Sequence, residues 1–253
     1  MGTGASISIC QSLSSIEIKH CTNKVGPSPQ RTFGVPLGSC IQDAVDSQVP
    51  LVVKHLVEYL EEFGLDHKGL FRTSGSATKI KELKQKYDRG EELDLVNEGD
   101  VDSAASLLKL FLNELPVAVF PEDTCAAVLA TFEENINHMA ECTRCLKTLL
   151  SDLPKAHYHL FHYLVTFLTK VSLHSDVNLM TLENLAIVFG PTLFRIPCGP
   201  LACEKQTFCN SVLLHALRHY EELLAGCSDS HFSVAEDRNP QSSGTVLPYT
   251  CLD

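Results

Sequence analysis

One arginine, Arg72, lies in a short segment bounded by glycines, Gly69-Leu-Phe-Arg-Thr-Ser-Gly75. Glycine allows the backbone a tight path, and the neighbouring Leu70 and Phe71 can anchor the segment in a core while Arg72 points outward. A guanidinium is planar, always charged and able to bind two oxygens at once, so this presentation suits a phosphate group. A loop arginine is more often simply solvated, and the segment alone does not decide between these interpretations.

Two other polar side chains lie in apolar surroundings. Lys109 lies within Leu107-Leu-Lys-Leu-Phe-Leu112, and Asn184 begins the run Asn184-Leu-Ala-Ile-Val-Phe-Gly-Pro191. A lysine in such a helix ordinarily extends its charged head into water. An asparagine in a first helical turn ordinarily makes a local hydrogen bond. The alternative interpretation is that both side chains face a ligand or partner.

Helical periodicity dominates the segments that must position these residues, because apolar residues recur there at intervals of three and four. The expected helices cover residues 51–63, 76–90, 103–115, 122–135, 141–150, 154–168, 184–190 and 203–224. We expect Gly64 to end the first helix in a left-handed conformation and Gly190-Pro191 to terminate the seventh. No alternating strand pattern lasts more than a few residues, so the sequence predicts an all-α bundle.

Composition divides the chain of 253 residues into three parts. Residues 1–32, rich in Ser, Gly and Pro, are expected to be a flexible N-terminal segment, 33–225 a single helical domain, and 226–253 a disordered tail. A hydrophobic content of 44% excludes a wholly disordered chain. A net charge of −11 argues against nucleic-acid binding and against holding an anionic membrane by charge alone.

The sequence also predicts a cellular compartment. No apolar run approaches the roughly 20 residues of a spanning helix, and no basic segment followed by a hydrophobic stretch marks a secretory signal. Eleven cysteines without such a signal are expected to be thiols in a reducing compartment. The expected location is cytoplasmic.

Three segments resemble the signature blocks of the RhoGAP domain and occur in the family's order: Gly69-Leu-Phe-Arg-Thr-Ser-Gly75, Leu107-Leu-Lys-Leu-Phe-Leu112 with Glu114-Leu-Pro116, and Asn184-Leu-Ala-Ile-Val-Phe-Gly-Pro-Thr-Leu193. The similarity covers roughly Phe33 to Ala225, and His174-Ser-Asp-Val-Asn-Leu-Met180 resembles the family's approach to the third block. One block would be weak evidence, whereas three in register are specific.

The resemblance implies a helical GTPase-activating domain that docks on GTP-bound Rho-family GTPases such as Rho, Rac and Cdc42. By this resemblance Arg72 is an arginine finger that completes the partner's active site, so the chain is not a stand-alone enzyme. GTP and Mg then belong to the partner, and the chain needs no cofactor or metal of its own. Lys109, Asn184 and Pro191 match family positions on the GTPase-facing surface.

One position departs from the family pattern. Asn113 stands four residues after Lys109, where the family usually has arginine. An amide is shorter and uncharged, and it cannot replace a bidentate guanidinium. The alternative function is therefore a catalytically weak or inactive module that binds GTPases or acts as a scaffold.

Cys142-x-x-Cys145, followed by His157 and His162, approaches zinc-finger spacing. A finger would need its own small ββα unit, but the cysteines lie in an expected helix and Pro154 opens another. We therefore expect no metal site here.

The N-terminal residues carry two further patterns. Met1-Gly-Thr-Gly-Ala5 and Ile9-Cys-Gln-Ser12, together with Ser103 to Leu112, are similar to the "family with sequence similarity 13" proteins. The opening residues also match the N-myristoylation pattern, with Gly2 as the acceptor. Because one acyl chain binds membranes only marginally, Cys10 is a candidate for a second lipid; a plain unmodified terminus is the alternative.

Overall fold

The computed structural model describes residues 31–40, 49–196, 199 and 202–224. All regular elements in these ranges are helices: η1 (Leu37–Ser39), α2 (Leu51–Phe63), α3 (Ala77–Arg89), α4 (Leu95–Glu98), α5 (Val101–Glu114), α6 (Glu122–Glu134), α7 (Met139–Ser151), α8 (Lys155–Leu173), α9 (Ser175–Asn178), α10 (Leu182–Phe194), α11 (Ala202–Arg218) and α12 (Tyr220–Leu224). The predicted all-α class is confirmed. The predicted segment 226–253 and nearly all of 1–32, including Gly2 and Cys10, lie outside the described residues.

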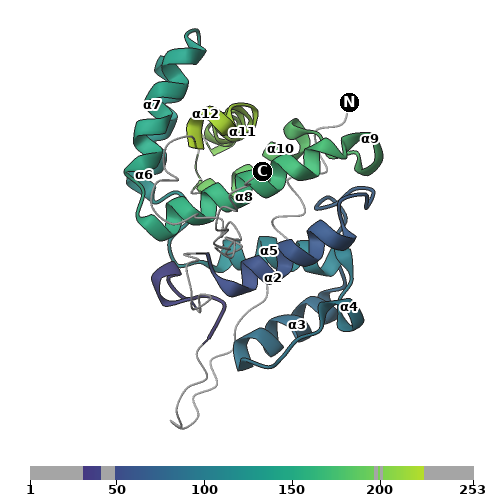
Figure 1. The fold of residues 1–253 in the computed structure, drawn as a ribbon. Helices are drawn as coiled ribbons and strands as arrows, with labels where there is room; N and C mark the ends of the chain where they lie inside the picture. Colours follow the sequence, from purple (N-terminus) through teal and green to yellow (C-terminus); the bar gives the residue numbers. More distant parts are fainter. Residues whose placement is uncertain (1–30, 41–48, 197–198, 200–201, 225–253) are drawn as a thin grey trace, which may run out of the picture.

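Two groups of helices meet along α8 and α10 (Figure 1). In one group, α5 packs against both α2 and α3, and α4 lies beside α3. In the other, α11 packs against α6, and α7 packs against α6 and α12. Because α10 contacts α5, α8 and α11, it joins the two groups. The residues predicted to do chemistry therefore come from elements that meet in the middle of the bundle.

The core is one continuous cluster in which aromatic rings bridge the helices. Phe120 stacks on Phe194 of α10 with ring centroids 4.4 Å apart and meets Phe161 of α8 edge-on at 4.9 Å. Offset-stacked and edge-on pairs of this kind are the favourable aromatic arrangements. They fix α10 against α8, which is the frame on which the site is built.

Three sequence-based expectations about helix ends are wrong. Gly64 ends α2 with φ −111°, not in a left-handed conformation. α10 continues through Pro191 to Phe194. The proline removes one N–H donor, and Ile187, four residues before it, is an exposed residue of the helix. The predicted helix 203–224 is two helices, because α11 ends at Arg218 and α12 begins at Tyr220.

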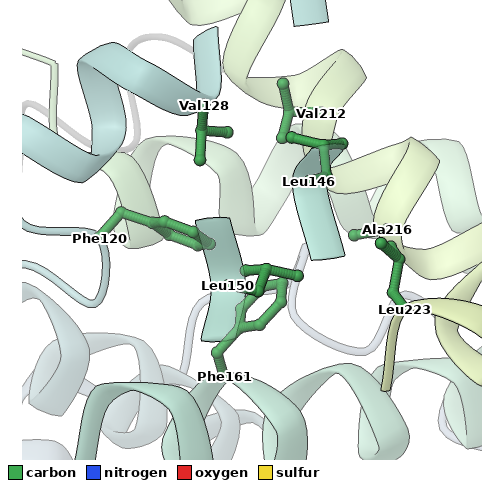
Figure 2. Close-up of a pocket in the computed structure, with 8 residues that line it drawn as sticks. All are labelled: Phe120, Val128, Leu146, Leu150, Phe161, Val212, Ala216 and Leu223. Atoms are coloured by element: carbon green, nitrogen blue, oxygen red, sulfur yellow. The ribbon is translucent and has the colours of Figure 1, made fainter. Parts of the chain in front are cut away.

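The second helix group encloses a small apolar cavity of about 10 Å³ (Figure 2). Its lining comes from α6, α7, α8, α11, α12 and the segment before α6: Phe120, Val128, Leu146, Leu150, Phe161, Val212, Ala216 and Leu223. A space of this size holds about one water molecule, and a water needs polar partners that this lining lacks. The cavity is a packing gap, and the functional residues must be sought at the surface.

Candidate functional site

Arg72 lies in the connection between α2 and α3, and its side chain is exposed. The two residues before it are buried, as the sequence predicts: Leu70 has no exposed surface and Phe71 is 1% exposed. The Phe71 ring packs edge-on against Phe189 of α10 at 4.9 Å and Phe167 of α8 at 6.0 Å. Arg72 is thus presented outward from a segment rooted between two core helices.

The backbone around Arg72 is folded into a tight turn. Gly69 has φ +77° and Phe71 has φ +69°; a bulky residue in the left-handed region is rare and costs on the order of 1–3 kcal/mol. The Gly69 carbonyl accepts hydrogen bonds from the N–H groups of Arg72 (2.8 Å) and Thr73 (3.1 Å). The sequence predicts the glycine but gives no sign of the strained phenylalanine.

Lys109 of α5 contacts this turn. Its Nζ donates a hydrogen bond of 2.6 Å to the carbonyl oxygen of Phe71, the residue before Arg72. A bond from a charged donor contributes about 1.5–3 kcal/mol. This contact links Lys109 to the residue before Arg72, and it explains how the Phe71 backbone is held.

The second glycine of the segment lies against the first half of α5. The Gly75 N–H donates to Ser106 Oγ at 3.1 Å, and a Cβ added to Gly75 would lie 2.4 Å from the Cα of Ser103. Only glycine permits this approach. Ser103 and Ser106 are buried. Ser106 was not predicted from the sequence; its signal was a serine between the apolar pairs Ala104-Ala105 and Leu107-Leu108.

Asn184 lies in the first turn of α10, after the capping residue Thr181, whose hydroxyl accepts from the Asn184 N–H at 3.3 Å. The Asn184 Nδ2 donates to the carbonyl of Leu179 at 3.0 Å, which is the local bond that such a residue ordinarily makes. Its Oδ1 has no hydrogen-bond partner among the described residues, so the amide oxygen is available to a ligand. Ile187 and Pro191 follow at intervals of three and four residues and share this face of α10.

Asn113 lies one turn after Lys109 near the end of α5 and is exposed. A positive charge, the half-buried Arg195, caps this helix end. Its Nη1 donates to the carbonyl of Leu115 at 2.6 Å and its Nη2 to that of Leu112 at 2.8 Å. Burial lowers the pKa of Arg195. The Arg195 guanidinium is therefore committed to the end of α5 and does not replace the missing arginine.

The structure brings the predicted residues together to different degrees. Arg72 and Lys109 meet through the Phe71 carbonyl. Asn184 is linked to the same turn through the segment before α10, because Gly69 N–H donates to the Asn178 carbonyl at 2.7 Å. No hydrogen bond or ion pair joins Asn113 or Pro191 to Arg72 in the described part of the chain; these two residues lie on α5 and α10.

No metal-binding cluster of three or more His, Cys, Asp or Glu side chains occurs among the described residues. Cys142 is buried within α7, and the Nδ1 of His157 lies 2.9 Å from the carbonyl oxygen of Val119. Within the same ranges, no helix is long and apolar enough to cross a bilayer.

Comparison with known proteins gives a consistent result. The RhoGAP domain family matches residues 50–198. The chain is 42% identical over 187 residues to Rho GTPase-activating protein 22 of Mus musculus, covering 71% of this chain and 26% of that protein. It is 35% identical over 197 residues to SLIT-ROBO Rho GTPase-activating protein 3 of Homo sapiens, covering 76% of this chain and 18% of that one.

Among solved structures, the crystal structure of human Rho GTPase activating protein 15 superposes with a TM-score of 0.72 at 28% identity. The match covers 78% of this chain and 94% of that chain. The chain thus spans a small part of the full-length relatives and almost all of the solved domain. The family match covers more than half of the chain, and the helical fold agrees with it. The chain therefore belongs to the RhoGAP domain family.

Proposed function

We propose that this chain is a GTPase-activating protein for Rho-family GTPases and that Arg72 is its arginine finger. The proposal rests on one observation, the exposed side chain of Arg72 on a firmly held backbone. Its guanidinium is exposed and forms no hydrogen bond or ion pair with another described residue, while the backbone that bears it is fixed by Lys109, Gly69 and Gly75. Because this backbone is already fixed, binding of the guanidinium costs only the rotamer entropy of its own side chain, about 2 kcal/mol at most.

Arg72 would enter the partner's active site and neutralise the negative charge that develops on the transferred γ-phosphoryl group. An arginine supplied in this way accelerates hydrolysis by about 10³–10⁵-fold, or roughly 4–7 kcal/mol. GTP and Mg²⁺ are bound by the GTPase, which also positions the attacking water. The chain contributes the charge and its placement.

The surface around Arg72 would bind the GTP-bound partner. Lys109, Asn113, Asn184 and Pro191 are the proposed contact residues, and Ile187 adds an exposed apolar side chain on the same face of α10. An apolar centre with polar residues around it is the usual composition of a protein interface. The family relatives are named for Rho GTPase activation, and the choice among Rho, Rac and Cdc42 is for the experiment to determine.

A second candidate function is a module that binds GTPases without accelerating hydrolysis. The observation that favours it is the exposed amide of Asn113 where a guanidinium would serve, together with the commitment of Arg195 to the end of α5. The exposed arginine at position 72 favours GTPase activation over binding alone.

Single-turnover GTP hydrolysis by Rho, Rac and Cdc42 proteins distinguishes the two functions. The wild-type chain should accelerate hydrolysis by at least one GTPase, and Arg72→Ala should lose about 10³-fold or more of that acceleration. Arg144→Ala is the matched control, because Arg144 is an exposed arginine of α7 in the other helix group. If the wild-type chain accelerates hydrolysis by none of these GTPases, the binding module without activation is favoured. If Arg72→Ala is fully active, Arg72 is not an arginine finger.

We also propose that the chain acts in the cytoplasm and that acylation at Gly2, with Cys10 as a second lipid site, recruits it to membranes. The support is the N-terminal sequence pattern alone. Gly2→Ala should move the protein from membrane to soluble fractions. An unchanged distribution would contradict recruitment by acylation at Gly2.

A further inference from the structure

Asn178, at the end of α9, is a completely buried polar residue whose side chain joins three separate segments. Its Nδ2 donates to the carbonyl of Leu65 at 2.7 Å and to the carbonyl of Val171 at 2.9 Å. Its Oδ1 accepts from the N–H of Met180 at 2.7 Å. Leu65 begins the connection that contains Arg72, Val171 lies in the last turns of α8, and Met180 precedes α10.

The main chain of Asn178 adds a fourth link, because its carbonyl accepts from the Gly69 N–H at 2.7 Å. Both side-chain donors and the side-chain acceptor are thus used, and the next residue's carbonyl holds Asn184. A buried amide that left any of these groups unpaired would cost its full desolvation penalty. Together these bonds hold the turn around Gly69 relative to the start of α10.

Another contact joins the same two segments, but it is exposed. His174 Nδ1 lies 2.7 Å from Asp66 Oδ1, with side-chain exposures of 39% and 72%. Exposed ion pairs contribute little to holding a geometry. The Phe71 ring also packs on Phe189 of α10, and among the polar contacts it is the buried Asn178 that ties the Arg72 turn to the start of α10.

We infer that Asn178 is a positioning residue for GTPase activation, which sets Arg72 at the right place relative to the docking face of α10. The inference rests on the proposed function. Asn178 does not touch the partner, because it is buried. Loss of its bonds should leave docking through α5 and α10 intact and should displace the guanidinium, and a misplacement of about 1 Å can reduce a rate by 10²-fold.

The test uses Asn178→Asp, which keeps the shape and the acceptor for Met180 and removes at least one of the two donated bonds, because a carboxyl group has at most one O–H to donate. The maximal single-turnover rate at saturating chain should fall by about 10–100-fold. The dissociation constant for the GTPase carrying a non-hydrolysable GTP analogue should stay within about twofold of wild type. Thr143→Val is the matched control, since Thr143 is a buried hydroxyl that bonds Met139 O and His215 Nε2, each at 2.9 Å, in the other helix group.

The outcomes distinguish a failure of the proposed function from a failure of the positioning role of Asn178. If wild type does not accelerate hydrolysis, the proposed function fails. If wild type is active and Asn178→Asp keeps its maximal rate, or if Thr143→Val at an equal loss of melting temperature loses as much rate, the positioning role is overturned. Amide hydrogen exchange on wild type covers the case in which Asn178→Asp does not fold. The Gly69 amide should exchange as slowly as core amides, and fast exchange there would also overturn the role.

Discussion

The two cations of the candidate site, Arg72 and Lys109, have different parts in it. The Arg72 head group has no partner within the described residues, so it is available to a phosphate. The Lys109 head group bonds the Phe71 carbonyl and helps to hold a strained backbone. Sequence alone offered the same two interpretations for both residues, solvated or functional. Their roles differ because Lys109 contacts a residue 38 positions earlier in the chain. No local sequence pattern encodes such a contact.

Lys109→Met should lower the maximal rate of GTP hydrolysis by about 10–100-fold, because the loss of a charged hydrogen bond of roughly 1.5–3 kcal/mol releases the turn before Arg72. The measurement is single-turnover hydrolysis at saturating chain. Lys84→Met is the control, since Lys84 forms an ion pair with Glu114 at 2.6 Å between α3 and α5. Equal rates for the two variants would contradict the support role of Lys109.

Asn113→Arg should lower the chain concentration needed for half-maximal acceleration by about 2–10-fold, because a guanidinium at an exposed interface position can bind an oxygen pair that an amide cannot. A titration of the hydrolysis rate against chain concentration measures this. Asn137→Arg adds the same charge between α6 and α7 as a control. An unchanged or weaker response to Asn113→Arg would mean that the departure from the family pattern is neutral.

At the scale of elements, the connection between α2 and α3 is held by α5, α8, α9 and α10. The sequence predicted its anchoring residues, because hydrophobicity is a local signal. Ser76, where the predicted helix 76–90 begins, caps α3, and its hydroxyl accepts from the Lys79 N–H at 3.5 Å. The sequence did not predict Ser106 or Asn178, whose partners lie 31 and 113 residues away. It misjudged Pro191, because the tertiary packing of a helix can override the local preference of a proline.

Gly75→Ala should lower both stability and activity. The added Cβ would lie 2.4 Å from Ser103 Cα, and overpacking of this kind costs about 1–3 kcal/mol. We expect a fall in melting temperature of roughly 2–12 °C and a clear fall in the maximal rate, since the turn must move off α5. Thermal unfolding and the hydrolysis assay check this together. A fully active Gly75→Ala would show that this approach to α5 is not needed.

At the scale of the whole molecule, the helix group without predicted site residues contains the buried histidine of the bundle. His215 of α11 is buried beside Thr143 of α7. Burial, followed by the charge of His219, lowers the pKa of His215. Burial also lowers the pKa values of His159 and His162 of α8. The sequence predicted the helices that carry these residues, but burial depends on how the helices pack.

These histidines predict a pH dependence of stability. Each has a folded pKa below the ordinary value of about 6.5, so the unfolded chain takes up protons first as the pH falls. The contribution to stability is full above about pH 6.5 and is lost as the pH falls through the lowered folded pKa values. The melting temperature should therefore drop between about pH 7.5 and pH 5.5, and the drop should be smaller in His215→Gln. A melting temperature that stays constant or rises would contradict this assignment.

Binding to a transition-state mimic tests the central role of Arg72 most directly. A GTPase that carries GDP and aluminium fluoride imitates the transferred phosphoryl group, and a residue that acts in the transition state should favour this form over a non-hydrolysable GTP analogue. We predict that the wild-type chain binds the mimic at least about 10²-fold more tightly than the analogue and that Arg72→Ala binds both forms equally. An Arg72→Ala variant that keeps the wild-type preference, or a wild-type chain that shows none, would contradict the account.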